Sequence, residues 1–263
     1  MADANSNVVL YEVKDNIAFI TLNRPEKLNA LNTDVYVELG KIWKRVEQEE
    51  DVFVAILSAN GKHFSAGADL GGMNLDPKIG DEAIRSNGIR VFKPIISAVN
   101  GYALGAGYIL AVRCCDLTLA AESAKFGFPE PRIGTSGMPT FYPHMLLKRN
   151  LQFRLMSGGR EDFIDAHTAC DWGIVNKVVP DDELMPEAIR WAEKIKLNAP
   201  LTNRVIKYGL YRSVYRLAGD ARNVAIEEEY AYEHFMKPQE ESEDKKEGVK
   251  AFMEKRAPKF KGK

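Results

Sequence analysis

Short apolar runs typical of buried β-strands alternate with amphipathic segments over the first half of the chain. The runs 17–22 (IAFITL), 53–58 (FVAILS) and 95–99 (IISAV) are rich in β-branched residues and carry no charge. Between the first two, residues 33–49 repeat apolar side chains at helical spacing, directly after the N-cap residue Asn32. Strands that alternate with helices are joined by crossovers and therefore pair in parallel. The sequence predicts an α/β fold.

The remaining elements divide the chain into a core, 1–198, and a helical region, 199–263. Residues 8–13 (VVLYEV) pair with 17–22 in an N-terminal hairpin, because Lys14-Asp15-Asn16 is turn material. The charged run 239–247 is expected to be a solvated linker or one face of a helix. Further elements are a strand at 116–120 and helices at 141–156, 165–172, 187–198, near 200–235 and at 248–255.

Composition excludes several classes of partner. The net charge of −1 gives no electrostatic footprint for nucleic acid or for an anionic membrane, and no run is long and apolar enough to span a bilayer. Three cysteines, two of them adjacent, are a poor disulfide framework. The scattered histidines have no metal-site spacing. Since the N-terminus also lacks a secretory signal, we expect a cytoplasmic protein with no metal, nucleic-acid partner or membrane partner.

Two turns of small residues follow predicted strands, at 65–68 (SAGA) and 105–107 (GAG). The second is a weak dinucleotide signature, because Leu110 replaces the last glycine of G-x-G-x-x-G. A helix that begins near Ala106 would leave the N–H groups of its first turn unpaired, and small residues let a ligand oxygen approach them. If both turns meet at the carboxyl edge of a parallel sheet, they form an oxyanion hole; otherwise they are ordinary tight turns.

Six segments stand in order along nearly the whole chain: 23–31 (NRPEKLNAL), 63–70 (HFSAGADL), 93–101 (KPIISAVNG) running into 105–107, 126–134 (FGFPEPRIG), 169–179 (ACDWGIVNKVV) and 248–260 (GVKAFMEKRAPKF). Together they resemble those of the enoyl-CoA hydratase/isomerase (crotonase) family. The resemblance implies a crotonase-like spiral of ββα units with a C-terminal helical trimerisation region, assembled as a homotrimer or dimer of trimers. It also implies an acyl-CoA thioester substrate, with coenzyme A as part of that substrate and no separate cofactor.

The same resemblance implies roles for individual residues. The N–H groups of Ala68 and Ala106 would hold the thioester oxygen, and Glu130 would be the acid/base; otherwise Glu130 is a surface or helix-capping carboxylate. Phe252 and Lys255 would reach the CoA of a neighbouring subunit, unless they are a core aromatic and a plain surface lysine. The residues that would line the CoA in its own subunit are Lys27, Leu28, Ala66, Asp69 and Leu70.

The sequence departs from the family pattern at Ile109, where hydratases of the family commonly carry a second glutamate. A single glutamate in an apolar pocket would have a raised pKa, which suits a group that both gives and takes a proton near neutral pH. Tyr108, Ile109 and Met138 are expected to line the acyl pocket, which would then accept a cyclic or branched acyl group; core packing is the alternative for these residues.

Four functions remain open, in a fixed order of preference. The first is an enoyl-CoA hydratase-like lyase that hydrates a 2-enoyl-CoA through a thioester enolate, in fatty acid or aromatic acid metabolism. The second is a double-bond isomerase, which needs only one carboxylate. The third is an acyl-CoA decarboxylase that relies on the oxyanion hole, and the fourth is a CoA-binding family member without turnover.

Overall fold

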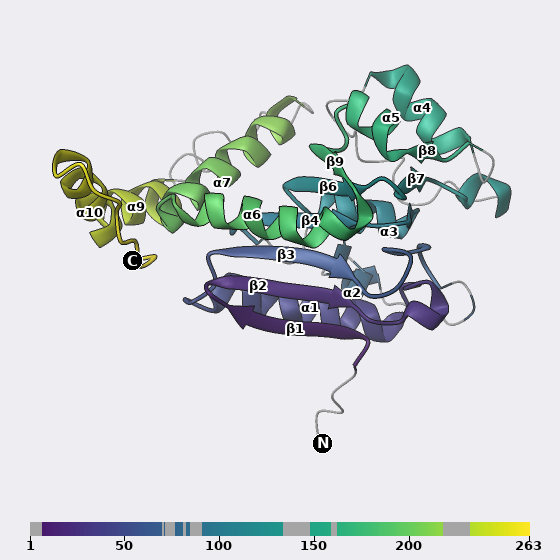
Figure 1. The fold of residues 1–263 in the computed structure, drawn as a ribbon, viewed down its shortest axis with the longest axis horizontal. Helices are drawn as coiled ribbons and strands as arrows, with labels where there is room; N and C mark the ends of the chain where they lie inside the picture. The colour runs from purple at the N-terminus through teal and green to yellow at the C-terminus, as the bar shows by residue number, and fades with distance from the viewer. Residues whose placement is uncertain are drawn as a thin grey trace.

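A parallel sheet with helices on both faces forms the body of the protein (Figure 1). The computed structural model describes residues 7–69, 71, 77–80, 83–84, 91–133, 148–158, 162–217 and 232–263. Within them the main sheet has the order β1-β2-β3-β4-β6-β9. Only the β1–β2 hairpin is antiparallel, and the other neighbours pair in parallel, as the sequence predicts. The strands are β1 (Val9–Lys14), β2 (Ile17–Leu22), β3 (Val54–Ala59), β4 (Ile95–Val99), β6 (Leu117–Ala121) and β9 (Lys177–Val179).

A small second sheet lies at the carboxyl edge of the first and has the order β5-β7-β8. It consists of β5 (Tyr102–Leu104), β7 (Lys125–Gly127) and β8 (Ile164–Asp165). The β5 and β7 strands pair in parallel, with Ala103 opposite Phe126. This pairing brings the chain after β5 next to the chain after β7, although about twenty residues separate them in the sequence.

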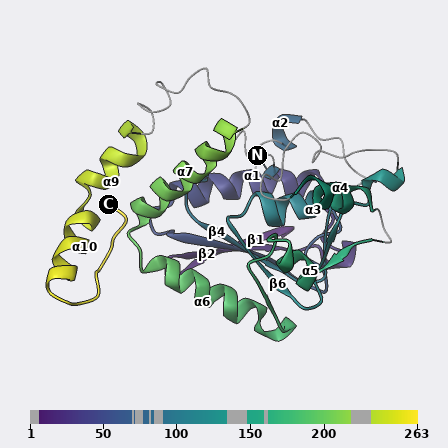
Figure 2. The ribbon, with the colours of Figure 1, turned by 90° about the horizontal axis from the view of Figure 1, so that it is seen from above.

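One helix covers each face of the main sheet, α1 (Thr33–Gln48) on one side and α6 (Leu184–Lys196) on the other (Figure 2). The Asn32 side chain caps α1 by accepting a hydrogen bond from Val35 N at 3.1 Å. Leu39 on α1 packs in one apolar cluster with Ile20, while Ala188 on α6 packs in another with Ile17. The strands are therefore buried on both faces, which explains their continuous apolar runs.

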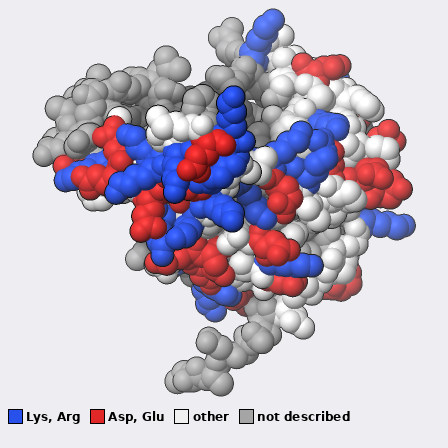
Figure 3. Space-filling model, turned by 60° about the vertical axis from the view of Figure 1, so that its left-hand side comes forward, with Lys and Arg blue, Asp and Glu red and all other residues white. Residues whose placement is uncertain are grey.

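The C-terminal helices extend away from the sheet: α7 (Pro200–Leu217), η9 (Tyr232–Met236), α9 (Lys237–Glu241) and α10 (Glu243–Met253) (Figure 1). Lys207 ties α7 to the sheet through an ion pair with Asp116 at 2.6 Å. Across the face that carries these helices, Lys and Arg alternate with Asp and Glu (Figure 3). No described helix is long and apolar enough to cross a membrane.

The last helix begins earlier than the sequence predicts, at Glu243 rather than 248. Residues 239–247 are therefore helical, which is the second of the two expectations for this run, because 239–241 end α9 and 243–247 begin α10. Glutamate and lysine are good helix formers, and the Asp244 carboxylate accepts the N–H groups of Lys261 and Gly262, which fixes the C-terminal tail beside the helix.

The predicted helix at 141–156 begins at Arg149, because Lys148 before it has a non-helical backbone with φ −58° and ψ 141°, and residues 141–147 lie outside the described residues. The remaining elements are short connections. They are η1 (Pro25–Lys27), α2 (Pro77–Gly80), α3 (Ala106–Tyr108), η3 (Ile109–Arg113), η4 (Glu130–Ile133), α4 (Arg149–Ser157), α5 (Ala166–Asp171) and η7 (Asp181–Glu183).

Candidate active site

The two turns of small residues lie side by side. Ser65 N donates to Tyr102 O at 2.7 Å, and Leu104 N donates to Ser65 O at 3.0 Å, so the chain before each turn runs parallel to the other. A Cβ atom on Gly67 would lie 2.9 Å from Leu104 O and 3.6 Å from Ala106 N. Because Gly67 also has φ +102°, only glycine permits this close approach of the two backbones.

The N–H groups of Ala68 and Ala106 are both available to a ligand. Leu31 N donates to Gly67 O and Asp69 N donates to Leu31 O, so the Ala68 N–H between them points away from Leu31. Ala106 is the first residue of α3, where the backbone N–H has no partner inside the helix. Among the residues that the structure describes, neither N–H donates a hydrogen bond.

Glu130 lies directly against the second turn. It follows β7, whose Gly127 O accepts a hydrogen bond from Gly105 N at 2.9 Å. A Cβ atom on Gly105 would lie only 2.0 Å from Glu130 Oε1 and 3.2 Å from Oε2. The carboxylate thus rests on the backbone of the residue before Ala106. The β5–β7 pairing creates this contact, since it brings the ends of the two strands together.

The surroundings of Glu130 favour its neutral form. Its Oε2 atom is buried and has no hydrogen-bond partner in the described structure. Burial raises the pKa of Glu130 above its ordinary value of 4.5, and a backbone hydrogen bond offsets part of that rise. A carboxyl group with a raised pKa exchanges protons near neutral pH more readily than an exposed one, as the sequence predicts for a single glutamate.

Two residues expected at the acyl pocket lie in the core. Tyr108 is fully buried, its ring packs edge-to-face on Phe128 at 5.0 Å, and burial raises its pKa. Ile109 is 4% exposed, belongs to the main apolar cluster and begins the π-helical turn η3. Core packing, the alternative that the sequence left open, describes both residues.

Three residues predicted to line the CoA lie together on a ridge beside Ala68. Leu28 O accepts a hydrogen bond from Ala66 N at 3.0 Å, and Asp69 follows on the same turn. Leu28 is 46% exposed and has a left-handed backbone with φ +52°, a costly conformation for a leucine, which ends the short helix η1. Lys27 next to it is also exposed.

Of the other predicted contacts with the substrate, two lie outside the described residues and two lie on or just beyond α10. Leu70 and Met138 lie outside the described residues. Phe252 is on α10, and its side chain is also not described, while Lys255 is exposed just beyond this helix. In both views α10 lies at the opposite end of the molecule from α3 (Figures 1 and 2).

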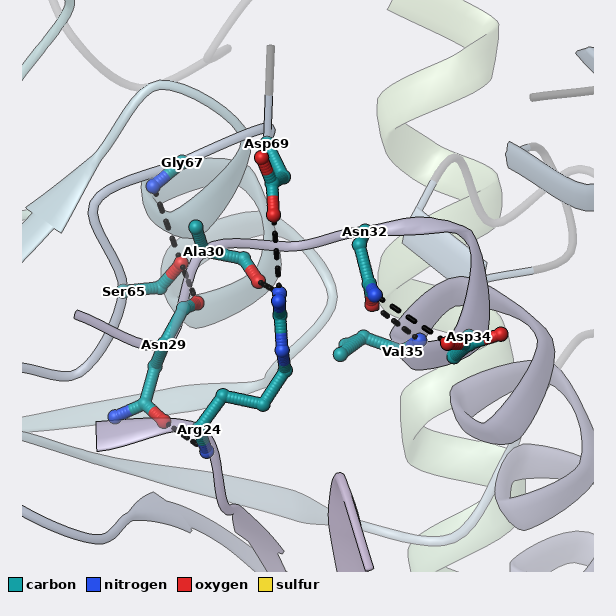
Figure 4. A network of polar contacts seen from close by, with 9 residues as sticks. All are labelled: Arg24, Asn29, Ala30, Asn32, Asp34, Val35, Ser65, Gly67 and Asp69. Atoms are coloured by element: carbon teal, nitrogen blue, oxygen red, sulfur yellow. Dashed lines mark hydrogen bonds and ion pairs between the residues drawn. The ribbon is translucent and has the colours of Figure 1, made fainter. Parts of the chain in front are cut away.

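A polar network behind the first turn contains residues to which the sequence assigned no role (Figure 4). Ser65 Oγ donates to Asn29 O at 2.8 Å and accepts from Gly67 N at 3.1 Å. Arg24 forms an ion pair with Asp69 at 3.2 Å. Arg24 and Asn29 lie within the 23–31 motif. Only their long-range contacts show that they differ in role from the other residues of this motif, and the sequence does not reveal those contacts.

No group of three or more His, Cys, Asp or Glu side chains within the described ranges is arranged to hold a metal ion. The candidate site therefore consists of two unpaired backbone donors, one carboxyl group of raised pKa and the ridge of Leu28, Ala66 and Asp69, of which only Leu28 is exposed. Donors of this kind stabilise an oxygen that gains negative charge, and the carboxyl group can transfer a proton beside it.

Several known proteins match the chain over almost its full length. The family model described as enoyl-CoA hydratase/isomerase matches residues 12–263. The (E)-benzylidenesuccinyl-CoA hydratase of Thauera aromatica is 33% identical over 97% of this chain and 99% of its own length. The short-chain-enoyl-CoA hydratase of Clostridium acetobutylicum is 35% identical, with coverages of 95% and 96%.

Solved structures agree with the sequence comparisons. An enoyl-CoA hydratase from Mycobacterium marinum superposes with a TM-score of 0.84 at 30% identity, covering 97% of this chain and 99% of that one. A structure described as a short chain enoyl-CoA hydratase, from Novosphingobium aromaticivorans, gives 0.82 at 31% identity, with coverages of 98% and 99%. The expected crotonase-like fold is confirmed, and the chain belongs to the enoyl-CoA hydratase/isomerase (crotonase) family.

Proposed function

We propose that this chain, as an enzyme of its family, adds water across the double bond of a 2-enoyl-CoA thioester. The observation that carries the proposal is the contact of Glu130 with Gly105, which places a carboxyl group of raised pKa beside the unpaired N–H of Ala106. The named hydratases among its relatives act on very different acyl groups, benzylidenesuccinyl-CoA and short-chain enoyl-CoA, and either kind fits this mechanism.

The N–H groups of Ala68 and Ala106 hold the thioester oxygen. When water attacks C3, the electron pair of the C2–C3 double bond moves onto this oxygen and forms an enolate. Two preorganised donors stabilise the new charge, and losing one such donor typically costs about 10²–10³ in rate. The proximity of Gly67 to Ala106 N supports this assignment, because it brings the two donors into one site.

Glu130 transfers both protons. It accepts a proton from the attacking water as the C3–O bond forms, and it then delivers a proton to C2 as the enolate collapses. A carboxyl group that performs both steps must be stable in both protonation states, and the raised pKa supports that requirement. Leu28, Ala66 and Asp69 form the ridge along which the CoA lies, with Lys27 at its exposed end.

Double-bond isomerisation is the second candidate, and the burial of Ile109 favours it. This apolar side chain is 4% exposed where the hydratases of the family commonly carry a second glutamate. Isomerisation removes a proton from C4 and returns one to C2 through a dienolate, whose oxygen the same two N–H groups can hold, and it needs only one carboxyl group. We further propose a cytoplasmic homotrimer or dimer of trimers without a separate cofactor, in which Phe252 and Lys255 reach the CoA of a neighbouring subunit.

The test compares Glu130→Gln with Glu122→Gln, a matched control at an exposed glutamate that follows β6. We expect Glu130→Gln to lower kcat for hydration by about 10²–10⁴, the usual contribution of a general acid/base, and to retain acyl-CoA binding. Glu122→Gln should match the parent enzyme. Full activity of Glu130→Gln would contradict the assignment.

A second measurement separates the two candidates. Incubation with 2-enoyl-CoA and 3-enoyl-CoA esters in D2O, read by mass spectrometry, distinguishes a water adduct from an exchanged isomer. Hydration predicts a mass gain of one D2O from the 2-enoyl ester. Deuterium exchange and double-bond migration without this adduct would favour the isomerase instead.

A further inference from the structure

We propose that Arg24 is a positioning residue for the first oxyanion donor: its contacts with Asp69 and Ala30 set the orientation of the Ala68 peptide. The inference rests on the proposed function of Ala68 and adds to it a group that does not touch the substrate. Figure 4 shows the Arg24 guanidinium between the turn that contains Ala30 and the turn that ends at Asp69.

One nitrogen of Arg24 joins the two turns. Nη1 donates to Ala30 O at 2.5 Å and to Asp69 Oδ2 at 3.2 Å. The Arg24 side chain is 15% exposed and that of Asp69 is 27% exposed, so bulk water competes with the contact only in part. A planar guanidinium with fixed N–H directions holds two acceptors in a defined geometry, which a flexible ammonium group does not.

The backbone segment that carries the Arg24 side chain is itself held in place. Arg24 N donates to Asn29 Oδ1 at 2.7 Å, and Asn29 N donates back to Arg24 O at 2.9 Å. The Asn29 side chain, which is 2% exposed, also donates to Asn60 O at 2.8 Å and His63 O at 2.7 Å. Residues 24–30 therefore form a rigid support, and the Arg24 side chain extends it to the donor turn.

Arg24 adds an anchor to the turn outside its backbone hydrogen bonds. The hydrogen bonds of Gly67 O and Asp69 N with Leu31 point the Ala68 N–H away from residue 31, and Gly67 N donates to Ser65 Oγ. These bonds still leave the turn free to tilt as a unit. The contact of Arg24 with the Asp69 side chain ties the end of the turn to residues 24–30, and it therefore fixes this tilt and with it the final direction of the Ala68 N–H.

The test uses Arg24→Lys and Arg24→Gln, with Arg154→Gln as the matched control. Arg154 on α4 also pairs with an aspartate, Asp162 at 3.0 Å, but both side chains of this pair are exposed. A misplacement of about 1 Å can cost about 10²-fold in rate, so we expect both Arg24 variants to lose about 10- to 100-fold in kcat. The KM and the Arg154→Gln variant should stay close to the parent values.

A spectroscopic signature separates positioning from a merely structural role. The carbonyl stretching frequency of a bound enoyl-CoA ester, labelled with ¹³C at the thioester carbon, falls when the oxyanion donors polarise the bond. We expect the parent enzyme to lower this frequency and the Arg24 variants to lower it less, at an unchanged thermal unfolding temperature. Arg24→Lys keeps the positive charge, so if Arg24→Gln does not fold, the carbonyl frequency and kcat of the Arg24→Lys enzyme test the inference.

The outcomes distinguish this inference from the proposed function. If the parent enzyme does not polarise the carbonyl, the oxyanion assignment itself is wrong. If the parent polarises the carbonyl and Arg24→Lys matches it in both frequency and kcat, then Arg24 does not position Ala68 and this inference alone is overturned.

Discussion

Replacing Gly105 with alanine should disable the site through a single methyl group. The new Cβ atom would lie 2.0 Å from Glu130 Oε1 and 2.9 Å from Glu130 Cδ, far inside van der Waals contact. Gly105 also has φ +51° and ψ −117°, a backbone conformation that alanine avoids at a cost of about 1–3 kcal/mol. Either the carboxyl group moves away or the turn that presents Ala106 changes shape.

Both responses remove a group from the reaction, so the loss of kcat should equal that of removing the acid/base, about 10²–10⁴-fold. Gly173→Ala is the matched control, because Gly173 has φ +77° but a Cβ atom there would meet nothing within 4 Å. It shares the positive φ angle without the collision. The assay is steady-state hydration of a 2-enoyl-CoA ester, with the unfolding temperature of each variant measured in parallel.

A double variant shows whether the loss acts through Glu130. In a Glu130→Gln background the acid/base is already gone, and Gly105→Ala should cost much less there than in the parent enzyme. A Gly105→Ala enzyme with parental kcat and KM would refute the contact as a determinant of activity. So would equal losses in the Gly105→Ala and Gly173→Ala enzymes.

Two further predictions concern stability. Burial raises the pKa of Glu130 in the folded state, so ionisation of Glu130 destabilises the fold above that pKa and has no effect below the unfolded value near 4.5. The Glu130→Gln enzyme should therefore unfold at a higher temperature than the parent enzyme at pH 8 and at the same temperature at pH 4. A lower unfolding temperature of the variant at pH 8 would show that folding lowers the pKa of Glu130 instead. Lys207→Met removes the 2.6 Å ion pair between α7 and Asp116 and should lower the free energy of unfolding in urea by about 2 kcal/mol, with KM unchanged. An unchanged urea midpoint of unfolding would show that this ion pair does not hold α7 on the sheet.

Local sequence patterns predict the secondary structure of this chain well where one rule dominates. The hairpin at β1 and β2 and the capped helix α1 follow from periodicity, turn residues and the Asn32 cap. The predicted start of the last helix was wrong, because a run of charged residues is compatible with a solvated linker and with a helix. Only the attachment of the C-terminal tail to Asp244 distinguishes the two.

The site could be predicted only in part, for a physical reason. The two small-residue turns and Glu130 are visible as segments, and family resemblance supplies their roles. The contact between Glu130 and Gly105 depends on the pairing of β5 with β7, and the Arg24–Asp69 contact joins residues 45 positions apart. Neither follows from local periodicity. Likewise, the sequence does not indicate that Tyr108 and Ile109 lie in the core, because an apolar residue suits a pocket and a core equally.

The position of a bound thioester oxygen tests the central claim most directly. An experimental structure with a non-reactive acyl-CoA ester, or with a 3-hydroxyacyl-CoA product, locates this oxygen relative to the two turns. The account predicts that the oxygen lies about 2.7–3.1 Å from both Ala68 N and Ala106 N, with the Glu130 carboxyl group facing C2 and C3. A thioester oxygen that contacts neither N–H, in an otherwise occupied site, would contradict it.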